Sequence, residues 1–156
     1  MIGAEQLWPA AGNPSVIALS HIDHLVIPCR DVDEVADFYV RVLGMEKRVD
    51  ANGRVAVHFG EQKFNLQQAG RESVIRASVH QAGTQDFCLI VEAPLDAVAA
   101  RLAELGVEIE EGPVTRNGAL GPMRSIYFRD PDGNLVELAV YGGVGEGADN
   151  GVGDGG

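Results

Sequence analysis

The chain repeats one pattern of predicted elements, and this repeat limits its fold more than any other feature. Each copy reads as a strand, a helix and three further strands, first over residues 22–68 and again over residues 85–141. The copies stay in step, because Leu43 and Leu105 lie 62 positions apart and the residues that follow them keep that offset. Two copies are too few for a solenoid, so the repeat indicates an internal duplication of one βαβββ unit.

The first copy carries local signals for each of its elements. Residues 22–28 alternate in the manner of a short strand. Asp31 is a candidate N-cap for a helix over residues 32–43, Glu34 completes a capping box, and Gly44 is a candidate C-cap. The three strands that follow are expected at about residues 45–50, 54–60 and 63–68.

The second copy has the same order of elements. Residues 86–92 read as an apolar strand, and Pro94 opens a helix whose apolar stripe ends at Leu105. A longer loop between the next strands raises the offset to 70 positions, so that Gln67 corresponds to Glu137. The three strands of this copy are expected at residues 107–114, 124–130 and 134–141.

This pattern predicts one α+β domain over residues 21–141. Its two βαβββ modules, about 21–82 and 83–141, should each form a four-stranded sheet, with a half-open cleft between the sheets and a helix on each outer face. Residues 1–20 are expected to form an irregular arm. Residues 142–156 contain eight glycines and are expected to be a disordered tail.

Composition excludes several classes of partner. Twelve basic residues against 23 acidic ones give a net charge of −11, which argues against binding to nucleic acid or to an anionic membrane surface. No segment has the length and apolarity of a membrane span, and the first residues do not resemble an export signal. Two cysteines do not make a disulfide framework, so a reduced, cytoplasmic protein is expected.

Glu137 stands in the middle of an apolar strand and needs an explanation. A carboxylate that is buried without a partner is costly, so Glu137 either faces water or meets a positive charge. Because side chains alternate along a strand, Glu137 should point away from the apolar face and into the cleft. The same alternation places Gln67 and its neighbour Asn65 on the cleft face of the first module.

The first strand of each module adds two further polar positions. His24 should face the cleft because Leu25 faces the helix, and the offset of 62 positions maps His24 onto Asp86. One imidazole and three oxygen donors at matching positions suit a divalent cation, which would offset the charge of Glu137. The sequence therefore predicts a metal site formed by four residues: His24, Asp86, Glu137 and Gln67.

Each of these positions also has an ordinary structural interpretation. A single histidine in a strand is usually a satisfied core or surface residue. Glu137 fits an edge strand that faces solvent, and Asp86 fits the start of a strand that leaves a turn. His58 and His80 are secondary candidates, of which His58 should line the cleft. Cys88 reads as a small apolar filler on the cleft face.

Several stretches resemble the vicinal oxygen chelate superfamily: HIDHLVI, FYVRVLGM and YFRDPDGNLVEL. This superfamily includes glyoxalase I, extradiol dioxygenases, fosfomycin-modifying thiol transferases and bleomycin-sequestering proteins. Within it, the chain is similar to the small glyoxalase domain-containing protein 5 and virulence-associated bacterial group. The resemblance covers about residues 20 to 141.

The resemblance implies particular roles for the candidate residues. It implies metal ligands at His24 and Glu137, a third at Asp86, and a fourth at Gln67, where many relatives have histidine at the last two positions. It also implies that Ser125 and Tyr127 contact the substrate, although an alternating strand with one polar face accounts for both equally well. A homodimer is the usual arrangement in such a family.

The shared chemistry of the superfamily implies a function. We expect a metal-dependent enzyme of the lyase or isomerase type that chelates a small oxygenated metabolite through two neighbouring oxygens, with Glu137 as ligand and catalytic base. The ion would be Mn²⁺, Ni²⁺, Fe²⁺, Mg²⁺ or Zn²⁺, and Asn65, His58, Ser125 and Tyr127 would contact the substrate. The alternatives are a non-catalytic, antibiotic-sequestering protein and a thiol transferase of the fosfomycin-resistance type.

Overall fold

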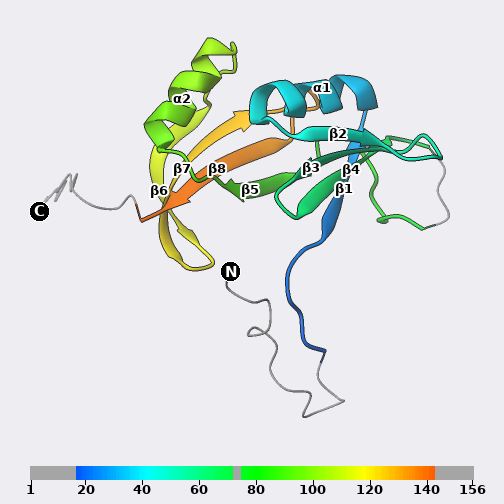
Figure 1. Cartoon of the computed structure of the whole chain (residues 1–156), viewed down its shortest axis with the longest axis horizontal. Helices are drawn as coiled ribbons and strands as arrows, with labels where there is room; N and C mark the ends of the chain where they lie inside the picture. The colour runs from blue at the N-terminus through cyan, green and yellow to red at the C-terminus, as the bar shows by residue number, and fades with distance from the viewer. Residues whose placement is uncertain (1–16, 72–74, 143–156) are drawn as a thin grey trace, which may run out of the picture.

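Two βαβββ modules follow one another along the chain in the computed structural model, which describes residues 17–71 and 75–142 (Figure 1). Most of the predicted arm at 1–20 and all but the first residue of the predicted tail at 142–156 lie outside the described residues. None of the described helices has the length and apolar character needed to cross a membrane. The α+β fold predicted from the repeat is confirmed.

Each module forms its own four-stranded mixed sheet, with strand orders β1-β4-β3-β2 and β5-β8-β7-β6. No strand within the described ranges closes either sheet into a barrel. The first module contains β1 (His24–Cys29), α1 (Val32–Leu43), β2 (Glu46–Val49), β3 (Val55–Phe59) and β4 (Gln62–Gln68). The second contains β5 (Asp86–Ile90), α2 (Leu95–Glu104), β6 (Glu111–Gly118), β7 (Gly121–Arg129) and β8 (Leu135–Tyr141).

Helix α1 begins and ends where the sequence predicts. The side chain of Asp31 accepts a hydrogen bond from the backbone N–H of Glu34 at 3.0 Å, as an N-cap should. Gly44 ends the helix with a φ of 67°, a left-handed conformation that glycine adopts without steric cost. Between these caps, Val35 and Tyr39 are fully buried, so the apolar stripe of the helix faces the core.

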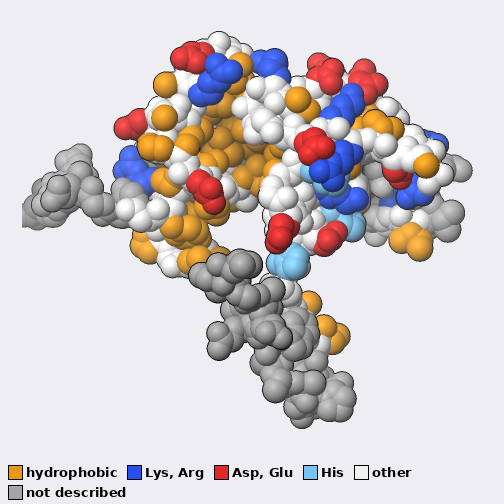
Figure 2. All heavy atoms as spheres, viewed as in Figure 1, with side chains coloured by type: hydrophobic (Ala, Val, Ile, Leu, Met, Phe, Trp, Pro, Cys, Tyr) orange, Lys and Arg blue, Asp and Glu red, His pale blue; other side chains and the backbone are white. Residues whose placement is uncertain are grey.

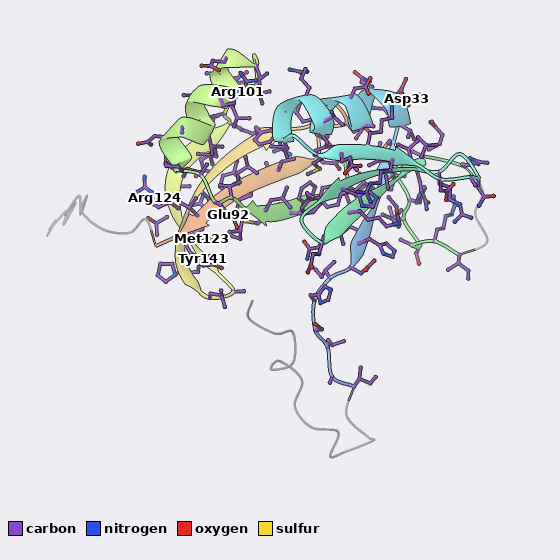
Figure 3. The ribbon with its side chains drawn as sticks, viewed as in Figure 1. Asp33, Glu92, Arg101, Met123, Arg124 and Tyr141 are labelled. Atoms are coloured by element: carbon purple, nitrogen blue, oxygen red, sulfur yellow. The ribbon has the colours of Figure 1, made fainter. Side chains whose placement is uncertain are left out.

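Strand β6 differs from the prediction. It runs from Glu111 to Gly118 rather than over residues 107–114, so most of the segment expected to be a long loop forms an antiparallel hairpin with β7. Gly118 lies against the Tyr141 hydroxyl and the Met123 sulfur, and a Cβ atom there would collide with both. Met123 and Tyr141 lie opposite each other at this end of the sheet (Figure 3).

The two modules share one hydrophobic core. Both helices lie on the same side of the molecule, and apolar side chains gather between them (Figures 1 and 2). Phe64 of the first sheet contacts Phe87 of the second, with ring centroids 4.9 Å apart. Phe38 of α1 packs against Phe128 of β7 in the same cluster. This core fixes the position of each sheet relative to the other.

The turn after β7 also joins the modules. Arg30, which follows β1, donates hydrogen bonds to the Asp132 carboxylate at 2.8 Å and to the Pro131 carbonyl at 2.8 Å. The hydroxyl of Tyr39 donates to Asp130 at 2.8 Å, and Asp130 is only 5% exposed. The DPDG segment is therefore a contact between the modules as well as a turn.

Candidate functional site

Glu137 lies on the face of the second sheet that points away from α2. Its neighbours Val136 and Leu138 are buried in the core, so alternation along β8 directs Glu137 to the opposite face, which we call the helix-free face. Cys88 of β5 and Tyr127 of β7 lie directly opposite Glu137 on either side. Glu137 therefore shares the helix-free face with Cys88 and Tyr127.

Two polar side-chain atoms on this face are buried without a hydrogen-bond partner in the described structure. One is the Oε1 atom of Glu137, and the other is the hydroxyl oxygen of Ser125, whose side chain is fully buried. Ser125 pairs with Ala139, two residues from Glu137, so both atoms belong to the same region of the sheet. Unpaired buried polar atoms are rare in native proteins, which makes this region suited to an ion or a polar ligand.

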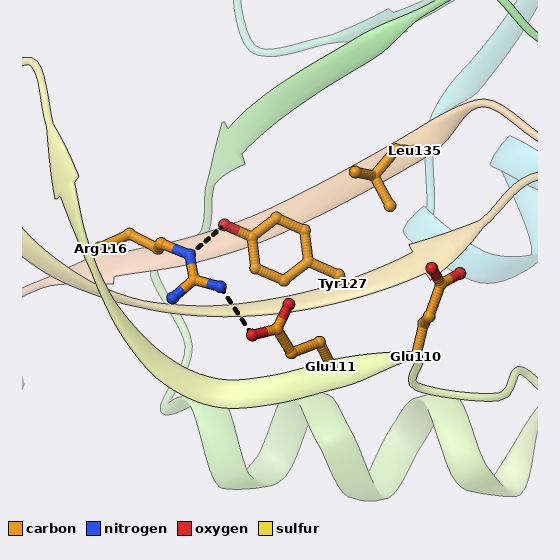
Figure 4. Close-up of a pocket in the computed structure, with 5 residues that line it drawn as sticks. All are labelled: Glu110, Glu111, Arg116, Tyr127 and Leu135. Carbon is orange, nitrogen blue, oxygen red and sulfur yellow. Dashed lines mark hydrogen bonds and ion pairs between the residues drawn. The ribbon is translucent and has the colours of Figure 1, made fainter.

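Tyr127, which lies directly opposite Glu137, also lines a hollow of about 480 Å³ (Figure 4). The Nε atom of Arg116 donates a hydrogen bond to the Tyr127 hydroxyl at 3.1 Å, and its Nη2 atom contacts Glu111 at 2.7 Å. Burial and the neighbouring Glu137 carboxylate raise the pKa of Tyr127, while Arg116 opposes that rise. The hydroxyl therefore stays protonated at neutral pH.

Asp86, the first residue of β5, is the other carboxylate predicted to bind metal on the second sheet. It is exposed and lies opposite Leu135. Cys88 follows it by two residues on the same face of β5, so Asp86 is diagonal to Glu137. Across Leu135 lies Arg129, which pairs with Glu110 through contacts of 2.7 and 2.8 Å. Asp86 and Glu137 thus share the helix-free face on neighbouring strands.

His24 lies on the first sheet, at the start of β1. It is exposed, and its Nδ1 atom is 2.6 Å from Asp23, whose pKa is lowered mainly by this hydrogen bond. Lys63 lies directly opposite His24, and His58 lies opposite Lys63 on the next strand. His58 therefore occupies the same face as His24, as predicted, and burial together with Arg48 lowers its pKa.

The strand register corrects one predicted equivalence. If His24 corresponds to Asp86, then Val26 corresponds to Cys88, and their partners across the sheet are Asn65 and Glu137. Asn65, rather than Gln67, is therefore the counterpart of Glu137, and the offset at this strand is 72 rather than 70 positions. Gln67 lies two residues further along β4, on the same face as Asn65.

Gln67 contacts the segment between the modules. The Oε1 atom of Gln67 is 3.2 Å from the Nε2 atom of His80, so His80 reaches the helix-free face of the first sheet. The Nδ1 atom of His80 is also buried without a hydrogen-bond partner in the described structure. The amide oxygen proposed as a fourth ligand is thus engaged by an imidazole within the single chain.

The single chain does not assemble the predicted ligands into one group. Across residues 17–71 and 75–142, no three histidine, cysteine, aspartate or glutamate side chains lie close enough to hold a metal ion together. Asp86 and Glu137 share one sheet, whereas His24 stands on the other. The residues that the sequence did not single out are Lys63, Arg116 and Glu111. Lys63 is marked only by its alternation with the buried Phe64, and β6, which carries Arg116 and Glu111, contains no buried residue.

Cys88 should react slowly with alkylating reagents. Burial of the thiol, and next the Glu137 carboxylate opposite it, raise the pKa of Cys88 to about 12. At pH 8 the reactive thiolate should then be much scarcer than in an ordinary cysteine, although Cys88 itself is exposed. Labelling of the full chain by iodoacetamide at pH 8, followed by mass spectrometry, measures this rate. A rate within about tenfold of that of glutathione would contradict this environment.

Comparison with known proteins identifies the family of this fold. The sequence profile of the Glyoxalase/Bleomycin resistance protein/Dioxygenase superfamily matches residues 21–138. The chain is 46% identical to the glyoxalase domain-containing protein RDO1 of Mycosarcoma maydis over 125 residues, which cover 80% of this chain and 70% of that protein. It is 42% identical to the virulence protein STM3117 of Salmonella typhimurium, covering 79% and 85% of the two chains.

A solved structure agrees with this assignment. An integron cassette protein from the mobile metagenome of V. cholerae superposes with a TM-score of 0.78 at 43% sequence identity, covering 81% of this chain and 98% of that one. Both the sequence and the arrangement of two βαβββ modules are thus shared over the described domain. The chain belongs to the glyoxalase/bleomycin resistance protein/dioxygenase superfamily.

Proposed function

We propose that the protein is a metal-dependent enzyme of the lyase or isomerase type, acting on a small metabolite that carries two neighbouring oxygens. The observation that supports this most strongly is the buried Oε1 atom of Glu137, which has no partner in the described structure. Asp86, on the neighbouring strand of the same face, supplies a second carboxylate. Carboxylate oxygens with one imidazole are a donor set that Mn²⁺, Mg²⁺ and Fe²⁺ favour and that Ni²⁺ and Zn²⁺ also accept.

The residues of this face fit the proposed chemistry. A divalent ion bound there would polarise the substrate oxygens and stabilise the negative charge that develops on them. Glu137 is the proposed base, because a carboxylate next to the substrate can take up a proton. Tyr127, protonated and directly opposite Glu137, can donate a hydrogen bond to a substrate oxygen. The hollow beside Tyr127 would hold the rest of the substrate.

A second copy of the chain would complete the ligand set. His24 lies on the first sheet, and the single chain does not bring it into a group with Asp86 and Glu137. Two-fold symmetric dimers are the commonest oligomers. In such a dimer the same patch of both protomers meets, so a residue at one end of the patch lies against the other end of the patch in the partner. We therefore propose a homodimer in which His24 of one protomer joins Asp86 and Glu137 of its partner.

Mixing two inactive variants tests this arrangement. His24→Ala and Glu137→Gln should each lose Mn²⁺ binding, measured by electron paramagnetic resonance of the free ion. When the two variants are unfolded together and refolded, mixed dimers contain one intact site, so about a quarter of the wild-type sites should return. A mixture that binds no more Mn²⁺ than either variant alone would exclude a site shared between protomers.

The competing function is sequestration of a small molecule without catalysis. Metal analysis of the purified wild-type protein separates the two, because the proposed enzyme requires the ion and a sequestering protein does not. Binding of Mn²⁺ that depends on both His24 and Glu137 supports the enzyme. Wild-type protein that neither contains nor binds a divalent ion would leave the sequestering function as the better account.

A further inference from the structure

We propose that Lys63 binds a carboxylate group of the substrate, at a position separate from the two oxygens that the metal holds. This inference rests on the proposed function and adds a class of substrate to it, a hydroxy or oxo acid with a second, distal carboxylate. Lys63 lies in the middle of the first sheet's helix-free face, where basic and histidine side chains gather (Figure 2).

Lys63 is the cation on these faces that has no partner within the described residues. The arginines on the same faces are each held by a glutamate: Arg48 by Glu46, Arg116 by Glu111 and Arg129 by Glu110, at distances between 2.7 and 2.9 Å. No hydrogen bond or ion pair of the Lys63 ammonium occurs in the described structure, although the residue is half-buried. A lysine can pack its aliphatic stem against a sheet while its ammonium stays open to solvent, so this unpaired charge is available to an anion that enters the face.

Three acidic groups near Lys63 are already engaged. Asp23 is hydrogen-bonded to His24 at 2.6 Å, and Glu46 forms two contacts of 2.9 Å with Arg48. Asp50 accepts hydrogen bonds from the backbone N–H groups of Asn52 and Arg54 at 2.8 and 3.0 Å. None of these carboxylates is therefore free to neutralise Lys63 without giving up a partner.

The position of Lys63 fits a ligand that also reaches the metal. Lys63 lies directly opposite His24, the proposed metal ligand, and neighbouring strands are about 4.8 Å apart. A hydroxy acid of three or four carbons can span this distance between its chelating oxygens and a distal carboxylate. His58, on the other side of Lys63, has a lowered pKa and offers a neutral imidazole N–H to the same carboxylate.

The negative net charge of the chain favours anion binding only at a specific cation. With a charge of −11, the protein repels small anions in general, so an anion must find a specific cation in order to bind. The helix-free face of the second sheet carries more negative than positive side chains, and the proposed divalent ion only balances that excess. The negative side chains are Asp86, Glu110, Glu111 and Glu137, and the positive ones are Arg116 and Arg129. The distal carboxylate is therefore better placed on the first sheet, at Lys63.

A pair of matched probes tests the proposal. Malate and lactate share a 2-hydroxycarboxylate that can chelate the metal, and only malate has a distal carboxylate. Calorimetric titration of the full chain with Mn²⁺ bound should show malate binding about tenfold or more tighter than lactate, as expected for a charge-assisted hydrogen bond. Lys63→Met should bring the two affinities to within about twofold, and Lys63→Arg should keep part of the preference.

Controls separate this proposal from the proposed function. Arg48→Met removes a cation from the same face that is already paired, and it should leave the preference for malate unchanged. Circular dichroism and Mn²⁺ affinity show whether Lys63→Met is folded and retains the metal site. Equal affinities for malate and lactate in the wild type, or an unchanged preference in Lys63→Met, would overturn the role of Lys63.

The same titrations without metal cover the case in which the protein binds no Mn²⁺. If the protein fails to bind Mn²⁺, the proposed function is contradicted. The unpaired charge of Lys63 would still be available to an anion. A preference for malate in the metal-free protein that disappears in Lys63→Met would then still support the anion site. Absence of that preference would reject it.

Discussion

Glu137→Gln should abolish the rise in melting temperature that Mn²⁺ produces in the wild-type protein. An ion that binds the folded state alone stabilises it by about 2.7 kcal/mol when its concentration is a hundred times Kd, which raises the melting temperature by several degrees. Glutamine keeps the size of the side chain and one oxygen but removes the charge that attracts the ion. The shift in the variant should therefore be less than about 1 °C, and any metal-dependent activity should disappear.

The same substitution should not harm the metal-free protein. The Oε1 atom of Glu137 is buried without a partner in the described structure, so the carboxylate costs stability when no cation offsets it. Removing its charge should leave the melting temperature in chelator unchanged or slightly higher. Thermal melts of both proteins, in chelator and in Mn²⁺, measure these quantities.

Glu111→Gln is a matched control for this experiment. Glu111 lies in the same row of the sheet, but its carboxylate is exposed and paired with Arg116. Its loss should leave the Mn²⁺-induced shift intact. If Mn²⁺ raises the melting temperature of Glu137→Gln as much as that of the wild type, Glu137 does not bind the metal.

Asp130→Asn should lower the free energy of unfolding by about 3 kcal/mol or more. The carboxylate accepts four hydrogen bonds at 2.7–3.0 Å, from the backbone N–H groups of Asp132 and Asn134, the Asn134 amide and the Tyr39 hydroxyl. An asparagine amide presents an NH₂ group to at least one pair of these donors, which then lose their acceptor. Because Asp130 is buried, water cannot replace the lost partner.

Urea unfolding followed by circular dichroism measures this loss. Asp96→Asn is the control, because Asp96 is exposed in the first turn of α2 and should contribute about 0.5 kcal/mol or less. Tyr39→Phe removes one of the four donors and should fall between the two, at about 1–2 kcal/mol. A loss in Asp130→Asn no larger than in Asp96→Asn would show that the hydrogen bonds to Asp130 contribute little to stability.

Much of the fold was predictable because its signals are local. The caps of α1 and the alternation in β1, β5 and β8 depend on neighbours within a few residues, and both helices were predicted at their observed places. Alternation also predicted the faces of His58 and Glu137 correctly. These are properties that one segment of sequence determines by itself.

The remaining features depend on contacts between distant segments. The equivalence of Asn65 with Glu137 follows from the pairing of β4 with β1, which loop lengths alone do not determine. The start of β6 at Glu111 is set by its hairpin with β7. Asp130 reads as an ordinary turn residue, and only the approach of Tyr39 from the other module reveals its burial. The failure of His24 to join the other ligands likewise depends on how the modules pack.

The order of strands has a consequence for synthesis of the chain. In each sheet the last strand of the module, β4 or β8, lies between the first strand and the third. During translation β5 therefore waits without a partner until β8 leaves the ribosome. A chain that stopped near Asn134 would lose a central strand rather than an edge, and its unpaired β5 would be open to association with other nascent chains. Glu137, the proposed base, lies on that final strand, so a product truncated before β8 would lack the proposed base as well as being prone to aggregate.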